Sequence, residues 1–190
     1  SQLAMTPVDE HLRSQFEDQF AVGAEYQLAD LLSVGVRYVD RAIKRVVEGI
    51  GTFTNPASPR QLTGYVIGNP GFGDFGAPFD RPSRHYQALE FTASKALARN
   101  WFMTSSFVYA HAIGNYEGLY LSENDQLDPN ITLLYDIPSF VPNQNGKLRA
   151  DRPYQFKVHS AWTLKSGLTL SEGLLVSAGV PISTMGPEIV

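Results

Sequence analysis

The strongest constraint on the fold is a period of two between apolar and polar residues, which recurs in six stretches of the chain. In the first stretch, apolar side chains stand at the even positions from Phe20 to Leu28, with small or polar residues between them. Because successive side chains of a strand point to opposite faces, each stretch predicts a strand with one apolar and one polar face. The predicted strands are at about residues 17–28, 32–47, 84–97, 101–113, 152–164 and 168–182.

Short turns join these strands in pairs. Ala98–Asn100 and Lys165–Gly167 are predicted three-residue turns, and each ends in a residue that tolerates the left-handed conformation. An odd number of turn residues keeps the apolar sets of both strands on one face. The first pair fits less well, because its equivalent position is Leu31, so we expect a longer loop or a bulge there.

Long connections, residues 48–83 and 114–151, alternate with the short turns and are rich in Gly, Pro, Asn and Asp. Each strand reverses the chain direction, so all short turns fall at one side of the sheet and all long loops at the other. The alternating stretch Gly64–Asn69 lies inside a long loop, where parity makes it an excursion rather than a spanning strand.

Aromatic residues mark both ends of the predicted apolar face. Trp101 and Trp162 lie next to short turns, and Tyr109 and Tyr154 lie on the same face eight residues away. Eight residues span about 26 Å along a strand, or about 19 Å vertically at a tilt of ~45°, which approaches the apolar band of a membrane. The expected membrane-interface aromatics are Tyr26, Tyr38, Trp101, Tyr109, Tyr154 and Trp162.

These belts favour a membrane barrel over a soluble β-sandwich, which has no reason for aromatics at both ends of a strand. The fold class is therefore predicted as all-β, an antiparallel transmembrane β-barrel segment of about six spanning strands. We expect short periplasmic turns and long extracellular loops. Two charged residues fall on the apolar face, of which Lys95 can reach the interface, whereas Glu172 in mid-strand predicts a bulge or a change of register.

Several sequence blocks resemble the barrel of TonB-dependent receptors, specifically the Oar-like group, over about residues 17–183. They are Arg37–Arg41, Tyr65–Gly71, Arg84–Phe91 with its continuation to Trp101, Gly114–Gly118, Asp125–Thr132 and Ser177–Ser183. The resemblance implies an outer-membrane barrel of about 22 strands, an amino-terminal plug and a segment coupled to the TonB complex. Six strands cannot close such a barrel, so we expect a fragment of its later part that lacks the plug.

Composition argues against several other classes. Lys and Arg are scattered and the net charge is −4, so nucleic acid is not an expected partner. No apolar run reaches the length of a spanning helix. Cysteine is absent and His11, His85, His111 and His159 occur singly, so we predict no metal, no cofactor and no enzyme activity. A rival reading as an outer-membrane hydrolase would use His111 with Asp128 or Asp151.

Two groups of polar residues are candidate contacts for a solute. The predicted lumen-facing residues are Glu25, Arg37, Glu90, Lys157 and His159. They contact a plug or a solute, or they instead form cross-strand charge pairs, such as Glu25 with Arg37. The acidic loop 114–151 supplies the predicted ligand-binding residues Tyr116, Glu117, Tyr120, Glu123, Asp125 and Asp128. The alternative for this loop is a hydrated surface without a ligand, and calcium binding is left open.

The sequence thus predicts the wall of an outer-membrane receptor or transporter in a TonB-dependent uptake or export system. Its expected partners are lipid, lipopolysaccharide, its own plug and the TonB complex. The alternatives are a passive porin or adhesin barrel and a soluble β-sandwich binding module. No residue chooses among a metal chelate, a saccharide, a peptide and an exported protein as the solute.

Overall fold

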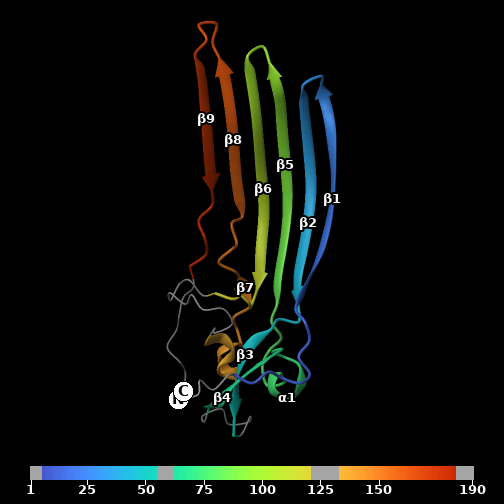
Figure 1. Ribbon diagram of the computed structural model, residues 1–190, viewed down its shortest axis with the longest axis vertical. Helices are drawn as coiled ribbons and strands as arrows, with labels where there is room; N and C mark the ends of the chain where they lie inside the picture. The colour runs from blue at the N-terminus through green and yellow to red at the C-terminus, as the bar shows by residue number, and fades with distance from the viewer. Residues whose placement is uncertain (1–5, 55–61, 121–132, 183–190) are drawn as a thin grey trace. The chain divides into compact units, whose positions relative to one another are not determined.

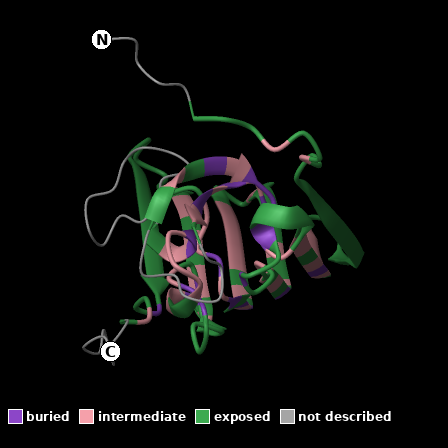
Figure 2. Ribbon diagram, turned by 90° about the horizontal axis from the view of Figure 1, so that it is seen from below, coloured by how far each residue is buried: buried purple, intermediate pink, exposed green. Residues whose placement is uncertain are grey.

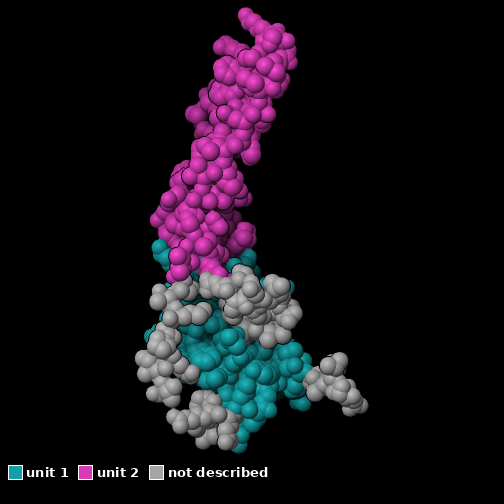
Figure 3. Space-filling model, turned by 90° about the vertical axis from the view of Figure 1, so that its left-hand side faces the viewer, with its two compact units in different colours: residues 1–18, 42–85, 113–148 teal, residues 19–41, 86–112, 149–190 magenta. Residues whose placement is uncertain are grey.

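The computed structural model describes residues 6–54, 62–120 and 133–182. The chain divides into two compact units, which Figure 3 colours separately. We name residues 1–18, 42–85 and 113–148 the connection unit, and residues 19–41, 86–112 and 149–190 the sheet unit. No described helix is long and apolar enough to cross a membrane.

Six long strands form one antiparallel sheet in the order β1-β2-β5-β6-β8-β9 (Figure 1). Five of these strands agree with their predicted ranges to within three residues at either end, because period two follows directly from the geometry of a strand, whereas β9 ends five residues before its predicted end. The strands are β1 (Phe16–Ala29), β2 (Leu32–Lys44), β5 (Arg84–Ala98), β6 (Trp101–Gly114), β8 (Tyr154–Thr163) and β9 (Thr169–Ser177). A two-residue strand, β7 (Gly146–Lys147), pairs with the end of β6.

The register of the sheet places the predicted aromatic belts opposite one another. Trp101 of β6 pairs with Trp162 of β8, and eight residues along the ladder Tyr109 pairs with Tyr154. Val158 lies midway between the two pairs. Directly opposed positions of an antiparallel pair bring side chains within reach of one another, which is how cross-strand pairs stabilise a sheet. The predicted eight-residue spacing on one face is confirmed.

The three tight turns agree with their predictions to different degrees. Lys165–Gly167 is a three-residue turn as predicted, with Gly167 at φ 85° and the amide of Leu164 donating to the carbonyl of Leu168. Between β5 and β6, however, both Arg99 and Asn100 have positive φ, at 50° and 64°, which is the conformation of a two-residue hairpin turn. Only two residues separate β1 from β2, so of the two alternatives expected there the longer loop is absent, and the bulge stays a prediction.

Glu172 remains on the apolar face, contrary to prediction. The ladder between β8 and β9 runs from Gln155↔Ser177 to Thr163↔Thr169 without a shift, so the expected bulge does not form. Glu172 lies directly opposite Ser160, whose Oγ accepts a hydrogen bond from Trp101 Nε1 at 3.2 Å. The carboxylate therefore stands in a polar spot of an otherwise apolar face, where a uniform ladder keeps every backbone bond that a bulge would break.

The two long connections fold into elements of their own. In the first, β3 (Glu48–Phe53) and β4 (Leu62–Gly68) form a separate antiparallel sheet, followed by α1 (Gly73–Gly76). The second contains the short helices η2 (Leu133–Tyr135) and η3 (Pro138–Phe140). The prediction that Gly64–Asn69 is an excursion is confirmed, since β4 pairs with β3 outside the main sheet.

The connection unit has a buried core, and buried residues can be followed in Figure 2. Its members come from both long connections and from the segment after β2: Val46, Ile50, Val66, Phe79, Tyr116, Tyr135 and Val141. The rings of Phe79 and Tyr135 meet edge to face with centroids 6.1 Å apart. Burial of apolar surface is the dominant favourable term in folding, so this core orders segments that the sequence presents as loops.

A substitution at Gly167 tests the backbone conformation of the turn between β8 and β9. Its φ of 85° is strained for any residue with a Cβ, although a Cβ there would meet nothing within 4 Å. Gly167→Ala should therefore cost about 1 kcal/mol of unfolding free energy in lipid vesicles through backbone strain alone. Gly146→Ala is the control, because its surroundings are equally open and its φ is not positive. Equal losses for the two variants would contradict this account of the turn.

Candidate functional site

The polar face of the sheet carries an ion pair between neighbouring strands. Arg37 of β2 donates from Nε to Glu90 Oε2 of β5 at 2.7 Å, and its terminal nitrogen is 2.5 Å from the same oxygen. The predicted partner of Arg37 was Glu25, and the structure corrects this. Glu25 faces Gly35 across the two strands, since a Cβ at Gly35 would lie 4.0 Å from Glu25 Cγ. Arg37 faces Gly23 in the same way, at 3.2 Å. Glu25 and Arg37 are therefore diagonal to one another rather than directly opposite.

Lys157 and His159 lie on the same face of β8. Lys157 pairs with Ser106 of β6, and His159 pairs with Thr104 of β6 and with Gly173 of β9. A Cβ at Gly173 would be 3.2 Å from His159 Nδ1, so the missing side chain leaves room for the imidazole. The ladder thus brings polar residues onto one face, and whether this face lines a lumen remains a prediction.

An apolar cluster interrupts the polar face, and sequence reasoning missed it. Val39, Ala88 and Ala110 are each at most 4% exposed, with Tyr86 and Val108 packed against them. The sequence does contain a signal for this cluster. Apolar residues stand at consecutive positions in Tyr38–Val39 and Phe107–Ala110, where an alternating strand would place polar ones.

The predicted interface aromatics differ in exposure. Five are exposed on the apolar face, namely Tyr26 at 68%, Trp162 at 58%, Tyr109 at 50%, Tyr154 at 49% and Trp101 at 37%. Tyr38 is less exposed and is held by polar neighbours, since its hydroxyl contacts Asp40 Oδ2 at 3.2 Å and accepts from Gln87 Nε2 at 3.1 Å. Lys95 places its ammonium 4.8 Å from the Trp101 ring centroid, consistent with the predicted reach toward the interface.

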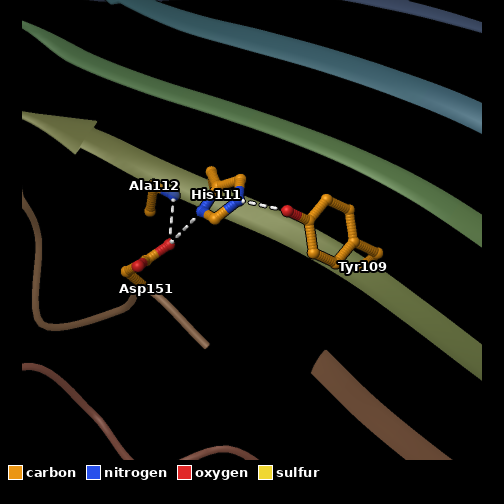
Figure 4. A network of polar contacts seen from close by, with 4 residues as sticks. All are labelled: Tyr109, His111, Ala112 and Asp151. Atoms are coloured by element: carbon orange, nitrogen blue, oxygen red, sulfur yellow. Dashed lines mark hydrogen bonds and ion pairs between the residues drawn. The ribbon is translucent and has the colours of Figure 1, made fainter. Parts of the chain in front are cut away.

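His111 forms a contact that the hydrolase alternative anticipated. In Figure 4 its ring lies between Asp151 and Tyr109, with Nδ1 3.3 Å from Asp151 Oδ1 and Nε2 3.0 Å from the Tyr109 hydroxyl. Asp151 Oδ1 also accepts a 2.9 Å hydrogen bond from the amide of Ala112. Tyr109 lies on β6 with His111, and Asp151 lies just before β8. Both ring nitrogens are therefore engaged within the sheet unit, which favours a structural role. Asp128 lies outside the described residues.

The predicted ligand-binding residues of the acidic loop that the structure describes differ in exposure. Tyr116 is 1% exposed and belongs to the core, so its side chain does not face solvent as a ligand contact requires. Glu117 is half-buried, and its carbonyl accepts from Arg84 at 2.8 Å, whereas Tyr120 is 53% exposed. Glu123, Asp125 and Asp128 lie outside the described residues.

The core of the connection unit contains a polar centre that the sequence did not reveal. Glu48 and Tyr135 are fully buried beside Tyr116. Burial, followed by the nearby charge of Glu48, holds the pKa of both tyrosines far above its ordinary value. These hydroxyls therefore stay protonated, and a local sequence pattern cannot show that three polar residues so distant along the chain meet.

No group of three or more His, Asp or Glu side chains is gathered as a metal site in the described part of the chain. Carboxylates and imidazoles are the usual oxygen and nitrogen ligands of protein-bound metals. The described residues therefore gather no such donor set, and calcium binding by the acidic loop, part of which lies outside them, stays a prediction.

Comparison with known proteins agrees with this architecture. A family model described as the outer membrane beta barrel domain matches residues 1–175. The TonB-dependent transporter Oar of Myxococcus xanthus is 33% identical over 156 residues, which cover 82% of this chain and 14% of that protein. The chain thus spans a small part of the length of this relative. No solved structure matches the chain.

Asp136 makes stability of the connection unit depend on pH. Burial raises the pKa of its carboxyl above the ordinary value, so the folded state binds the proton more tightly than the unfolded state. Stability is then lost as the pH rises from the unfolded to the folded pKa. Asp136→Asn should raise the melting temperature at pH 7 and flatten this part of the pH profile. Unchanged melting profiles between pH 4 and pH 7 would contradict the assignment.

Proposed function

The chain belongs to the outer membrane beta barrel domain family, and from this premise we propose that it forms part of the wall of a TonB-dependent receptor or transporter. The chain is located in the bacterial outer membrane, and its main sheet is antiparallel and open. The observation that carries the proposal is the 33% identity to a TonB-dependent transporter over 156 residues. The soluble β-sandwich alternative is set aside, because the long strands follow one continuous path through a single sheet.

The two faces and the two ends of the sheet are assigned different surroundings. In the proposal, the apolar face with its paired Trp and Tyr residues meets lipid, and lipopolysaccharide surrounds the outer rim. The face with the Arg37–Glu90 pair and Lys157 lines the lumen, where a plug and a passing solute make contact. The short turns then face the periplasm and the folded connections face the exterior.

Transport rather than catalysis is the proposed activity. The exposed side chains of the connection unit bind the solute, and a plug coupled to the TonB complex gates its passage. Tyr120 is the described member of the acidic loop set that presents an exposed aromatic side chain for such contact. The solute itself is not specified by these features.

A passive porin or adhesin barrel is the competing function, and two measurements on the full-length protein separate it from the proposal. In planar lipid bilayers a plugged receptor should show no steady ion conductance, whereas an open porin conducts. The purified periplasmic domain of TonB should bind the receptor in nanodiscs by calorimetry. Steady conductance together with no TonB binding would replace the proposal with a passive barrel.

The proposed lipid-facing side can be tested midway between the aromatic belts. Val158 lies on that face, and Thr104 lies on the opposite face of the neighbouring strand. Val158→Arg should lower the unfolding free energy in lipid vesicles by about 2–4 kcal/mol, because a cation at mid-depth loses its hydration. Thr104→Arg is the matched control and should cost less than about 1 kcal/mol if its face is wet. The reverse order would show that the faces are assigned the wrong way round.

A further inference from the structure

An open groove of about 380 Å³ lies within the sheet unit. Its lining comes from three neighbouring strands, β1, β2 and β5, which lie side by side in Figure 1. The lining residues are 24–26 of β1, 34–36 of β2 and 91–92 of β5. The volume is at the low end of the range for small-molecule sites, so the groove has room for a narrow ligand.

The groove opens on the apolar face of the sheet. Glu25, Gly35 and Thr92 belong to the polar face, since a Cβ at Gly35 would lie 4.0 Å from Glu25 Cγ and 2.7 Å from Thr92 Oγ1. A groove on that face would also be lined by residues two positions farther along, such as Arg37 and Glu90, and neither of these lines it. The residues one position away do line it, and they point to the apolar face: Ala24, Tyr26, Val34, Val36 and Phe91.

Two aromatic rings bound the groove, and short aliphatic side chains form its base. Tyr26 and Phe91 are 68% and 44% exposed. Their rings project farther from the sheet than the methyl groups of Ala24, Val34 and Val36 do. The result is a narrow apolar slot, which an extended hydrocarbon chain fits better than a polar solute does.

One side of the groove is fixed before a ligand arrives. The ring of Phe91 packs against that of Phe107 on β6, with centroids 6.4 Å apart and an interplanar angle of 32°. Phe107 in turn lies opposite Phe156 of β8 in the ladder. A ring held in this way loses little freedom on binding, so more of the contact energy holds the ligand.

Tyr26 supplies a polar group at the end of the groove nearest the short turns. It lies three residues before the end of β1 at Ala29, whereas Phe91 lies seven residues before the end of β5 at Ala98. Its hydroxyl forms no hydrogen bond with any of the residues that the structure describes. A tyrosine with an apolar ring and a free hydroxyl suits the boundary between hydrocarbon and headgroups.

The membrane limits what can fill the groove. The chain is located in the outer membrane, and water is excluded from the hydrocarbon that meets a lipid-facing surface. An apolar groove left empty there would forfeit dispersion contacts between its lining and the surrounding chains. The position near the short turns, which the proposed function places at the periplasm, favours the leaflet away from lipopolysaccharide.

We propose that this groove binds one acyl chain of a phospholipid from the periplasmic leaflet, while the Tyr26 hydroxyl donates a hydrogen bond to an oxygen of its ester or headgroup. The inference rests on the proposed function, which assigns this face to lipid, and it names a specific lipid site on that face. The chain lies between Tyr26 and Phe91 over the aliphatic base. It is therefore held more tightly than the lipid that meets the rest of the face.

Native mass spectrometry of the full-length receptor, titrated with a phosphatidylethanolamine that carries palmitoyl and oleoyl chains, tests the site. The delipidated wild-type receptor should retain one lipid at collision energies that remove the others. Ala24→Trp should weaken this binding at least tenfold, because an indole on the base fills the slot. Val22→Trp is the matched control and should leave the affinity unchanged, since Val22 is exposed on the same face of β1 but does not line the groove.

Tyr26→Phe tests the hydrogen bond separately, because it removes one oxygen and leaves both rings in place. It should weaken binding of the same phospholipid about fivefold, the size expected for one neutral hydrogen bond. The migration of unheated receptor on gels reports whether each variant is folded. Tyr26→Phe therefore tests the site even where Ala24→Trp does not fold.

Three results would overturn the proposal: no phospholipid retained by the wild-type receptor, equal affinity in Ala24→Trp and Val22→Trp, or equal affinity in Tyr26→Phe and the wild type. Retention of added lipopolysaccharide or of a second receptor copy in place of the phospholipid would also overturn it, and would assign the groove to that occupant. These readouts need neither conductance nor TonB. A receptor that binds TonB without retaining the phospholipid would therefore keep the proposed function and lose only this lipid site.

Discussion

The structure depends on one constraint, that the backbone groups of a strand need partners wherever water is excluded. A continuous ladder from β6 through β8 to β9 meets that need without a shift in register. Once the ladder is uniform, the face of every side chain follows from its parity. The Trp101–Trp162 and Tyr109–Tyr154 pairs are a consequence of this arrangement, and so is the position of Glu172 on the apolar face.

The same constraint is met differently in the two long connections. Their backbone groups pair in the β3–β4 sheet and in short helices, and the apolar side chains between them form a core. Glu48, Tyr116 and Tyr135 introduce polar groups into that core, where burial keeps the tyrosines protonated. The connections are therefore a folded unit with a core of their own.

Charge on the sheet is arranged by neighbouring strands rather than by neighbours in sequence. Arg37 reaches Glu90 across strands, and His111 reaches the buried Asp151 at the start of β8. Each contact fixes one strand against the next, and the Arg37–Glu90 pair also leaves the polar face with little net charge at that point.

The sequence by itself determined the six long strands, their two faces and the positions of the aromatic residues along them. These features depend on a period of two and on turn residues such as Gly167, which act over a few neighbouring residues. Only the tertiary structure decided that Arg37 pairs with Glu90, that Tyr116 is buried, and that Val8 pairs with Ile67 of β4. Such contacts join segments tens of residues apart, and they form because a shared core and a shared sheet edge bring those segments together, which no local pattern encodes.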